Sequence, residues 1–329
     1  MIPAVPVGAG ELVAAAVLSA LGAAGMGILA LPVLQQLRLG QAVRPEGPST
    51  HWGKAGTPTM GGVIFLVPAV LVGGFFAPTT LRLLALVAVT LGFALLGALD
   101  DYLKAVRRHP VGLKARHKLA AQASLGLLLA AAAQWSGLGT YVDLPFGLGR
   151  YELGPLYPAL VVLVLSGAAN AVNLTDGVDG LAAGASAIAL CGYAWIALAR
   201  QQGELAVWSL ALAGALAGFL LYNAHPARVF MGDSGSLALG GALGALAVLT
   251  KTELLLPLVG LLFVVETLSV MAQVTYFRLT GGRRLLRMSP LHHHLELGGW
   301  PEPRVAAAFW ALSLAGTVAG VWALRTLGG

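Results

Sequence analysis

Five aspartates lie in three short segments of the sequence. Asp100 and Asp101 are adjacent, Asp176 and Asp179 share the segment NLTDGVDG, and Asp233 lies in FMGDSGS. Mg²⁺ prefers hard oxygen ligands and is commonly held by one or two carboxylates together with phosphate oxygens of a substrate. Of two adjacent carboxylates near such an ion, one can act on the metal or its surroundings while the other accepts a proton. These residues predict a site that binds a metal ion and phosphate groups.

Helix capping is the structural alternative for these aspartates, because Asp favours the first turn of a helix. Capping would account for Asp176, Asp179 and Asp233. It accounts poorly for Asp100 and Asp101, which end a predicted helix, where the helix dipole repels anions. The glycines around Asp233 also let backbone N–H groups approach an anion at the start of the following helix. We therefore expect the adjacent pair and Asp233 to serve chemistry.

The elements that position these residues are predicted to lie in a membrane. The chain has 329 residues, of which 57% are hydrophobic and 10% are charged, whereas a soluble domain carries about 25% charged residues. This composition excludes a soluble enzyme and a disordered chain, and the single Cys191 excludes an intramolecular disulfide. The formal net charge of +6 comes from basic residues scattered between apolar stretches. A lipid bilayer explains that charge better than nucleic acid does, so no nucleic-acid partner is expected.

Ten apolar stretches are long enough to cross a bilayer, which takes about 20 residues of helix. Of the 20 Lys and Arg residues, 15 lie in the stretches that follow odd-numbered spans. Because positive residues remain in the cytoplasm, both termini are expected outside it, and every aspartate except Asp143 on the cytoplasmic side. The sequence thus predicts an all-α integral membrane protein, with residues 1–329 forming one ten-span domain and the polar site on the cytoplasmic face. The predicted spans are 10–37, 58–77, 80–100, 117–135, 154–172, 178–199, 205–223, 235–250, 254–277 and 305–326.

Three consecutive histidines follow the ninth span, in the segment SPLHHHLE. His292, His293 and His294 project in different directions, so they do not suit a single zinc ion. Histidine binds phosphate or sugar oxygens near neutral pH, which favours a substrate contact. The alternative is a basic loop that touches anionic lipid, for which the preceding arginines suffice. Within the ninth span, Glu266 is expected to hydrogen-bond between helices, and Gln273 lies nearer the cytoplasmic end, where it can reach a ligand.

Two other classes of protein fit parts of this pattern. The segment GDSG would make Ser234 the nucleophile of an intramembrane serine protease, with one of the three histidines as base. That interpretation leaves four cytoplasmic aspartates unused, and Ser234 is equally explained as a helix-start residue. An ion-coupled transporter would place acidic groups near the middle of the bilayer. Only Glu266 approaches that depth in the predicted spans.

Six segments of the sequence, in the same order, resemble the bacterial phospho-N-acetylmuramoyl-pentapeptide transferases (MraY), which belong to the polyprenyl-phosphate N-acetylhexosamine-1-phosphate transferase superfamily. The resemblance covers nearly the whole chain and implies a multi-pass protein of the bacterial inner (cytoplasmic) membrane. It also implies transfer of phospho-MurNAc-pentapeptide from UDP-MurNAc-pentapeptide to undecaprenyl phosphate, giving UMP and lipid I, with Mg²⁺ required. Relatives that use UDP-GlcNAc share the aspartate motifs but differ in the triple-histidine loop, so GlcNAc-1-phosphate transfer is the alternative. The segments are KAGTPTMGG (Lys54 to Gly62), LDDYLK (Leu99 to Lys104), NAVNLTDGVDGLA (Asn170 to Ala182), YNAHPARVFMGDSGSL (Tyr222 to Leu237), ETLSVMAQV (Glu266 to Val274) and SPLHHHLE (Ser289 to Glu296).

The resemblance also implies roles for individual residues. By motif, Asp233 is similar to the main Mg²⁺ ligand, and Asp100, with Asp101 beside it, to the group that deprotonates or positions the lipid phosphate. His292 resembles an essential loop histidine that steadies phosphate, while His293 and His294 would contact the donor further out. Lys118 resembles a pyrophosphate-binding residue, although the nearby Arg116 could serve equally. The positions that resemble the nucleoside and pyrophosphate pocket are Lys54, Thr59, Asn173, Asp176, Asp179, Asn223, Phe230, which would stack on uracil, and Gln273.

The implied reaction brings two anions together. An oxygen of the lipid phosphate would displace UMP at the sugar-side phosphorus of the donor, so the protein must neutralise charge and hold an in-line geometry. Mg²⁺ and Lys54 are expected to supply the neutralisation. Direct attack is favoured over a covalent phospho-aspartate, because a metal-bound Asp233 is a poor nucleophile. A homodimer is left open, because GxxxG-like spacings are too common in a chain with 44 glycines to identify a dimer face.

Overall fold

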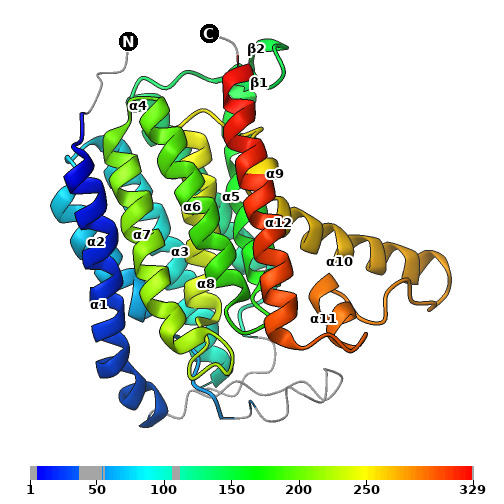
Figure 1. The fold of residues 1–329 in the computed structure, drawn as a ribbon. Helices are drawn as coiled ribbons and strands as arrows, with labels where there is room; N and C mark the ends of the chain where they lie inside the picture. The colour runs from blue at the N-terminus through cyan, green and yellow to red at the C-terminus, as the bar shows by residue number, and fades with distance from the viewer. Residues whose placement is uncertain (1–5, 37–53, 55, 106–111, 328–329) are drawn as a thin grey trace.

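The computed structural model describes residues 6–36, 54, 56–105 and 112–327 and shows an all-α membrane protein (Figure 1). Eight of its helices are long and apolar enough to cross a bilayer. In the bilayer interior a helix satisfies all of its own backbone hydrogen bonds, which is why apolar runs of this length adopt it. These helices are α1 (Ala9–Gln36), α3 (Leu81–Ala105), α5 (Tyr157–Thr175), α6 (Leu181–Ala199), α7 (Gly203–Asn223), α8 (Gly232–Leu249), α10 (Leu261–Leu279) and α12 (Glu302–Ala323).

Two further helices coincide with the remaining predicted spans. Helix α2 (Gly62–Phe76) has 15 residues and contains Pro68, and α4 (Ala115–Trp135) has 21 residues. The first turn of α4 carries Arg116 and Lys118, which lower its hydropathy. The count of ten spans and the orientation of the termini therefore stay predictions.

Several predicted boundaries were wrong, each at a glycine or proline. The second helix begins at Gly62 rather than residue 58, because Pro58 to Gly61 run alongside the segment before α8, with Phe230 N–H donating to Pro58 O at 2.9 Å. The ninth span is divided into α9 (Leu256–Val259) and α10, with Gly260 between them. Helix α6 begins only at Leu181, because the preceding residues form the turn between α5 and α6, in which Gly180 has a φ of 73°.

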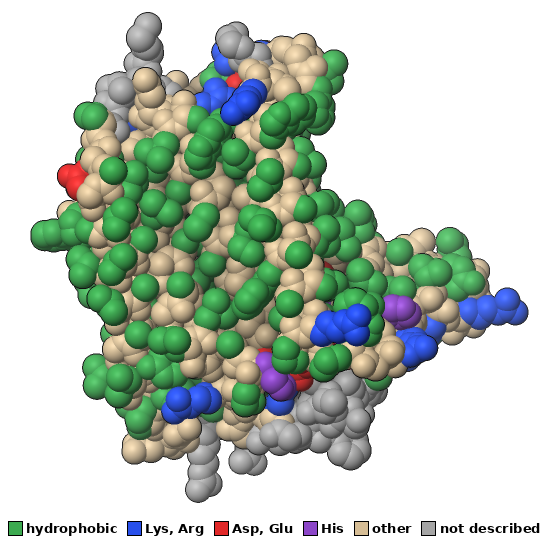
Figure 2. Space-filling model, viewed as in Figure 1, with side chains coloured by type: hydrophobic (Ala, Val, Ile, Leu, Met, Phe, Trp, Pro, Cys, Tyr) green, Lys and Arg blue, Asp and Glu red, His purple; other side chains and the backbone are tan. Residues whose placement is uncertain are grey.

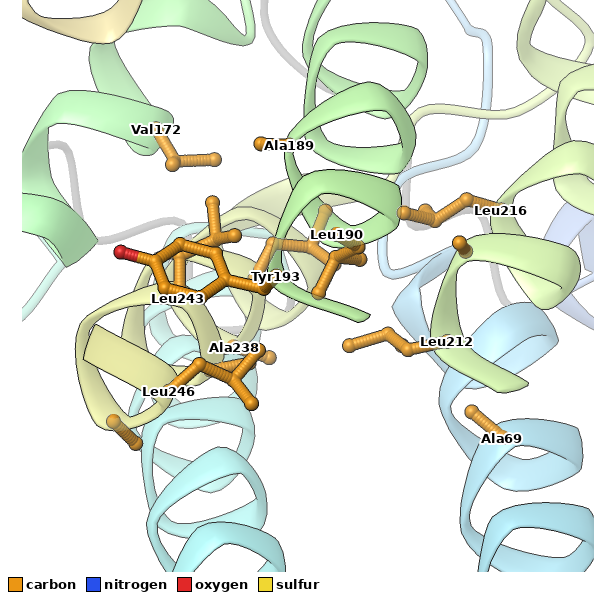
Figure 3. Close-up of a cluster of buried hydrophobic side chains, with 14 of the residues drawn as sticks. Ala69, Val172, Ala189, Leu190, Tyr193, Leu212, Leu216, Ala238, Leu243 and Leu246 are labelled. Atoms are coloured by element: carbon orange, nitrogen blue, oxygen red, sulfur yellow. The ribbon is translucent and has the colours of Figure 1, made fainter. Parts of the chain in front are cut away.

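Helix α8 forms the centre of the bundle, and all of its residues are buried. It packs against α3 and α5, while α7 packs against α1, α2 and α6, and α12 packs against α6. The many Gly and Ala residues of α8 allow this close approach from several sides. Figure 3 shows side chains of α6 and α8 meeting in this core, with Tyr193 beside Leu243. In contrast, α10 runs outward from the bundle, and the short helix α11 (Leu291–Glu296) lies beneath it (Figure 1).

The two ends of the bundle differ in their polar contents. The beginning of α1, the end of α12 and the hairpin of β1 (Tyr141–Leu144) and β2 (Gly149–Glu152) lie at one end (Figure 1). At this hairpin end, the buried Asp143 accepts a hydrogen bond from Arg150 Nε at 2.8 Å. On the face shown in Figure 2, Lys and Arg gather toward the two ends and the middle is hydrophobic, as a bilayer requires.

Candidate active site

The carboxylates of Asp100 and Asp233 meet at the end opposite the hairpin, where α3 ends and α8 begins. Gly97 makes this approach feasible, because a Cβ at that position would overlap the carbonyl oxygen of Asp233. Both side chains are buried within the described part of the chain. One oxygen of Asp100 accepts a hydrogen bond from Leu113 N–H at 2.6 Å, and one oxygen of Asp233 accepts from Asn173 Nδ2 at 2.7 Å. The other oxygen of each carboxylate, Oδ2, lies near two lysines.

Two lysines lie on those remaining oxygens. Lys104 Nζ is 2.5 Å from Asp100 Oδ2 and 3.0 Å from Asp233 Oδ2. Lys118 Nζ is 3.1 Å from Asp233 Oδ2 and 3.7 Å from Asp100 Oδ2. Because Lys118 makes these contacts while Arg116 is exposed, the structure places the lysine at the carboxylates. Sequence reasoning missed Lys104, although its spacing of four residues from Asp100 on one helix was an available signal.

Asp101 has a different position from its neighbour Asp100. Its two oxygens accept hydrogen bonds from the first amides of α8, those of Asp233 at 3.1 Å and Ser234 at 3.0 Å. Gly232 has a φ of 71°, and a Cβ there would lie 2.5 Å from Asp101 Oδ2 and 2.6 Å from the hydroxyl of the buried Thr59. The dipole at the end of its own helix predicts that Asp101 does not serve as a cap there. The carboxylate in fact caps another helix.

The turn from Asp176 to Gly180, between α5 and α6, lies beside this group. Burial raises the pKa of the Asp176 carboxyl well above its ordinary value, and the negative charges of Asp233, Asp101 and Asp179 raise it further. Several carboxyl groups therefore lie close to one another at this turn. A bound cation would relieve their mutual repulsion.

A second polar cluster surrounds Lys54. Lys54 Nζ is 2.7 Å from Asp179 Oδ1 and 2.5 Å from Glu302 Oε2, and His225 Nδ1 is 3.0 Å from Asp179 Oδ2. The same residues line a cavity of about 350 Å³. The ring of Phe230 is also near, with its centroid 6.0 Å from Lys54 Nζ. Sequence reasoning placed Lys54 among phosphates, whereas in the structure its ammonium group contacts two carboxylates. Glu302, at the start of α12, carried no motif that could have indicated it.

The donor atoms of Asp179, His225 and Glu302 all lie within 4.8 Å of one another, so this second cluster could hold a metal ion. However, the ammonium group of Lys54 lies directly on both carboxylates. A donor set containing a histidine nitrogen also suits Mg²⁺ less than carboxylates and phosphates do. The group around Asp233 offers only oxygen donors and already attracts two ammonium charges, which equal the charge of one Mg²⁺. The chemistry of the donors therefore fits Mg²⁺ better at Asp233.

The triple-histidine segment forms α11 and lies next to α10. His292 is buried, and its Nδ1 is 3.2 Å from Glu266 Oε2. His293 Nδ1 is 2.8 Å from Glu296 Oε2, and His294 Nδ1 accepts a hydrogen bond from Arg287 N–H at 3.1 Å. The rings of His292 and His293 pack edge to face, with their centroids 4.2 Å apart, while the polar partners of the three rings differ.

Two predicted substrate-binding residues, Gln273 and Asn223, form hydrogen bonds with the backbone of neighbouring loops. Gln273 Oε1 accepts hydrogen bonds from the amides of Leu285 at 3.0 Å and Leu286 at 2.8 Å. Asn223 Nδ2 donates to Val229 O at 3.0 Å, within the segment that leads to α8. Both amide side chains therefore hold neighbouring backbone segments in place.

Ser234 does not have the surroundings of a protease nucleophile. Its hydroxyl donates to Met231 O at 3.1 Å, as a residue in the first turn of a helix does. Among the described residues, each of the three histidines has other neighbours: Glu266, Glu296 and Arg287.

The fold and the site define an integral membrane enzyme with a buried cluster of carboxylates and lysines at one end of its helix bundle. A family model described as glycosyl transferase family 4 matches residues 83–251, and a phospho-N-acetylmuramoyl-pentapeptide-transferase signature matches residues 54–66. The chain belongs to the phospho-N-acetylmuramoyl-pentapeptide-transferase family.

Curated relatives with that name carry this conclusion. The protein of Moorella thermoacetica is 52% identical over 295 residues, covering 89% of this chain and 92% of the relative. Those of Shouchella clausii and Symbiobacterium thermophilum are 48% and 50% identical, covering 93% and 91% of this chain and 95% and 91% of the relatives. This protein is accordingly a multi-pass membrane transferase.

Proposed function

We propose that this protein transfers phospho-MurNAc-pentapeptide from its UDP carrier to undecaprenyl phosphate at the cytoplasmic face of the bacterial inner membrane. The products are UMP and lipid I, a precursor of peptidoglycan. The observation that carries the proposal, beside the family, is the convergence of Asp100 and Asp233 on the same two lysine ammonium groups. We further propose that residues 1–329 act as one domain with ten spans and both termini outside the cytoplasm.

Asp233 is the proposed Mg²⁺ ligand. Bound Mg²⁺ would supply charge neutralisation between the two phosphates. Asn173 Nδ2 donates both to Asp233 Oδ1 at 2.7 Å and to Ser236 Oγ at 2.8 Å, so it fixes the direction of the carboxylate. Once Asp233 is engaged, Lys104 and Lys118 would be free to bind the donor pyrophosphate. They take the neutralising role that the sequence had given to Lys54.

Asp100 is the proposed group that positions or deprotonates the lipid phosphate. Its carboxylate is fixed by Leu113 N–H and faces the lysines. The attacking oxygen would form a bond to the sugar-side phosphorus of the donor while the bond from that phosphorus to UMP breaks, in one step. UMP exchange into the donor by purified protein without lipid acceptor would instead indicate a covalent intermediate.

The cavity around Lys54 is the proposed nucleoside pocket. Asp179 and Lys54 line it and offer an acceptor and a donor to a base. The ring of Phe230, whose centroid is 6.0 Å from Lys54 Nζ, is the proposed stacking partner. Asp176 and Thr59 are proposed to bind the pyrophosphate. His292 would steady phosphate, and His293 and His294 would contact the donor further out.

The experiment that tests this function is a donor and acceptor assay with the purified protein in lipid nanodiscs. UDP-MurNAc-pentapeptide and UDP-GlcNAc are each supplied with undecaprenyl phosphate, with and without Mg²⁺. We expect UMP and lipid I from the first donor only, and no turnover after Mg²⁺ is chelated. Turnover of UDP-GlcNAc alone would assign the protein to the GlcNAc-1-phosphate branch of the superfamily.

Asp101 is proposed to position Asp233 by capping α8 rather than to contact substrate. Asp101→Asn is expected to reduce the free energy of unfolding by about 1 kcal/mol, because one of the two capping hydrogen bonds is lost, and to lower kcat by displacing Asp233. Thermal unfolding and initial rates measure the two effects.

Thr80→Ala is the matched control for Asp101→Asn. The Thr80 hydroxyl accepts from Leu83 N–H at 3.1 Å and so caps the other end of α3. It should lose comparable stability with kcat unchanged. An Asp101→Asn protein with normal stability and reduced kcat would show that Asp101 takes part in the chemistry itself.

A further inference from the structure

A hydrogen bond between two amide side chains joins α4 to α5 below the carboxylate site. Asn170 Nδ2 donates to Gln122 Oε1 at 3.0 Å and to the backbone oxygen of Ser166 at 2.7 Å. Gln122 is fully buried. The proposed reaction gives neither amide a task, so this polar contact between two membrane helices needs another explanation.

Both amides lie on the same helix faces as residues that reach Asp233. On α4, Gln122 is four residues from Lys118, and on α5, Asn170 is three residues from Asn173. Lys118 Nζ is 3.1 Å from Asp233 Oδ2, and Asn173 Nδ2 is 2.7 Å from Asp233 Oδ1. The placement of α4 against α5 therefore decides whether both side chains reach the same carboxylate.

On the other side of the amide pair, the two helices meet closely at a glycine. A Cβ on Gly126 would lie 2.8 Å from Val162 Cα. Gly126 is eight residues from Lys118, or about 12 Å along the helix, so a pivot of about 5° at this contact would move Lys118 by about 1 Å. Gln122 lies midway between Gly126 and Lys118, where its bond to Asn170 restrains such a pivot.

The amide pair is poorly arranged for stability alone. Gln122 Nε2 is buried and has no hydrogen-bond partner among the residues that the structure describes. A buried polar group that is only partly satisfied costs free energy, which an apolar side chain of similar size would avoid. The retained amide thus points to a role in placing α4.

We infer that Gln122 and Asn170 are positioning residues that hold Lys118 against Asp233. Their bond fixes α4 on α5 one helical turn from Lys118, and interhelical bonds of amide side chains are an established means of joining membrane helices. The contribution of Lys118 to donor binding rests on the proposed function. The placement of its ammonium group does not.

The first measurement is the reactivity of Lys118 in Gln122→Met, which has a side chain of similar length without the amide. Asn170 keeps its bond to Ser166 in this variant. Purified protein in lipid nanodiscs is treated with a limiting amount of an amine-acylating reagent, and mass spectrometry gives the labelling of Lys118 relative to the exposed Lys114 on the same side of the bundle.

We expect this labelling ratio to rise in Gln122→Met, because an ammonium group held between two carboxylates reacts slowly with such reagents. An unchanged ratio would overturn the inference. The ratio does not depend on turnover, so it still tests the placement of Lys118 if the wild type forms no lipid I and the proposed function fails.

The second measurement is a double-mutant cycle on lipid I synthesis. Gln122→Met is expected to lower kcat/KM for the UDP donor about 10–100-fold, because a displacement of about 1 Å at a binding group can cost that much. The KM for undecaprenyl phosphate should be nearly unchanged. In a Lys118→Met background the same substitution should have no further effect. An equal loss in both backgrounds would overturn the inference, since Gln122 would then act by a route other than Lys118.

Thr317→Val supplies the control for loss of a buried hydrogen bond between helices. The buried Thr317 hydroxyl donates to Val259 O at 3.2 Å and so joins α12 to α9. Its removal should change neither the labelling ratio nor kcat/KM. A rise in the labelling ratio equal to that in Gln122→Met would assign the effect to a general loosening of the bundle and overturn the role of the amide pair.

Discussion

Asp233→Asn is expected to lower the rate of lipid I formation about 10²–10³-fold, even at saturating Mg²⁺. Asparagine keeps the size of the side chain and one oxygen for Asn173 but removes the charge that attracts a cation. The loss should appear mainly in kcat, measured with labelled UDP donor and undecaprenyl phosphate. Because an ion that binds only the folded state stabilises it, Mg²⁺ should raise the Tm of the wild type and leave that of the variant unchanged.

Asp143→Asn is the control for the loss of a buried, ion-paired aspartate. Asp143 is 3% exposed and pairs with Arg150 at the hairpin end of the bundle. Its replacement should lower stability, since it weakens the charge-assisted hydrogen bond with Arg150, but not the rate per folded molecule or the Mg²⁺ effect on Tm. A normal rate in the Asp233 variant, with Mg²⁺ present, would mean that the metal assignment is wrong.

Asp100→Asn is expected to lower the rate of lipid I formation by a similar factor, but to leave the Mg²⁺ effect on Tm in place. If Asp100 acts on the lipid phosphate, its removal lowers kcat about 10²–10⁴-fold, the range for loss of a general base. The KM for the UDP donor and the rise in Tm with Mg²⁺ should both persist, because Asp233 and Asn173 remain in place. Initial rates at varied concentrations of each substrate, together with thermal unfolding, measure these quantities.

The comparison between these two variants separates the proposed roles. The two carboxylates share Lys104 and Lys118, so either substitution leaves an ammonium group with one partner fewer. A change in lysine pairing is therefore common to both and cannot explain a difference between them. Complete loss of the Mg²⁺ effect in Asp100→Asn would make Asp100 a metal ligand as well.

Much of the fold could be predicted from the sequence, because the bilayer imposes a local rule. A run of about 20 apolar residues must be helical to satisfy its backbone in lipid. Eight predicted spans match helices long and apolar enough to cross a membrane. The boundaries at residues 58, 178 and 254 were wrong, because turn geometry at Gly and Pro depends on neighbours such as Phe230 that hydropathy does not describe.

The grouping of the aspartates in the candidate site was predictable, but the contacts of each one were not. The aspartate motifs and their common side of the membrane follow from chain order and charge alone. Whether Asp100 or its neighbour Asp101 faces the lysines could not be predicted, since adjacent residues on a helix point in directions about 100° apart and only the packed partner distinguishes them. Glu302, which binds Lys54, lies in no recognisable motif.

The sequence by itself determined that this protein is an all-α membrane protein with a cluster of carboxylates near the span ends. Hydropathy and charge are properties of short segments, so they can be evaluated from the sequence without any knowledge of packing. The tertiary structure alone decided which charges meet. Asp101 is 132 positions from the amide of Asp233 that it caps, and Lys54 is 248 positions from Glu302. Such contacts depend on how α3, α8 and α12 pack together, and no local pattern encodes that arrangement.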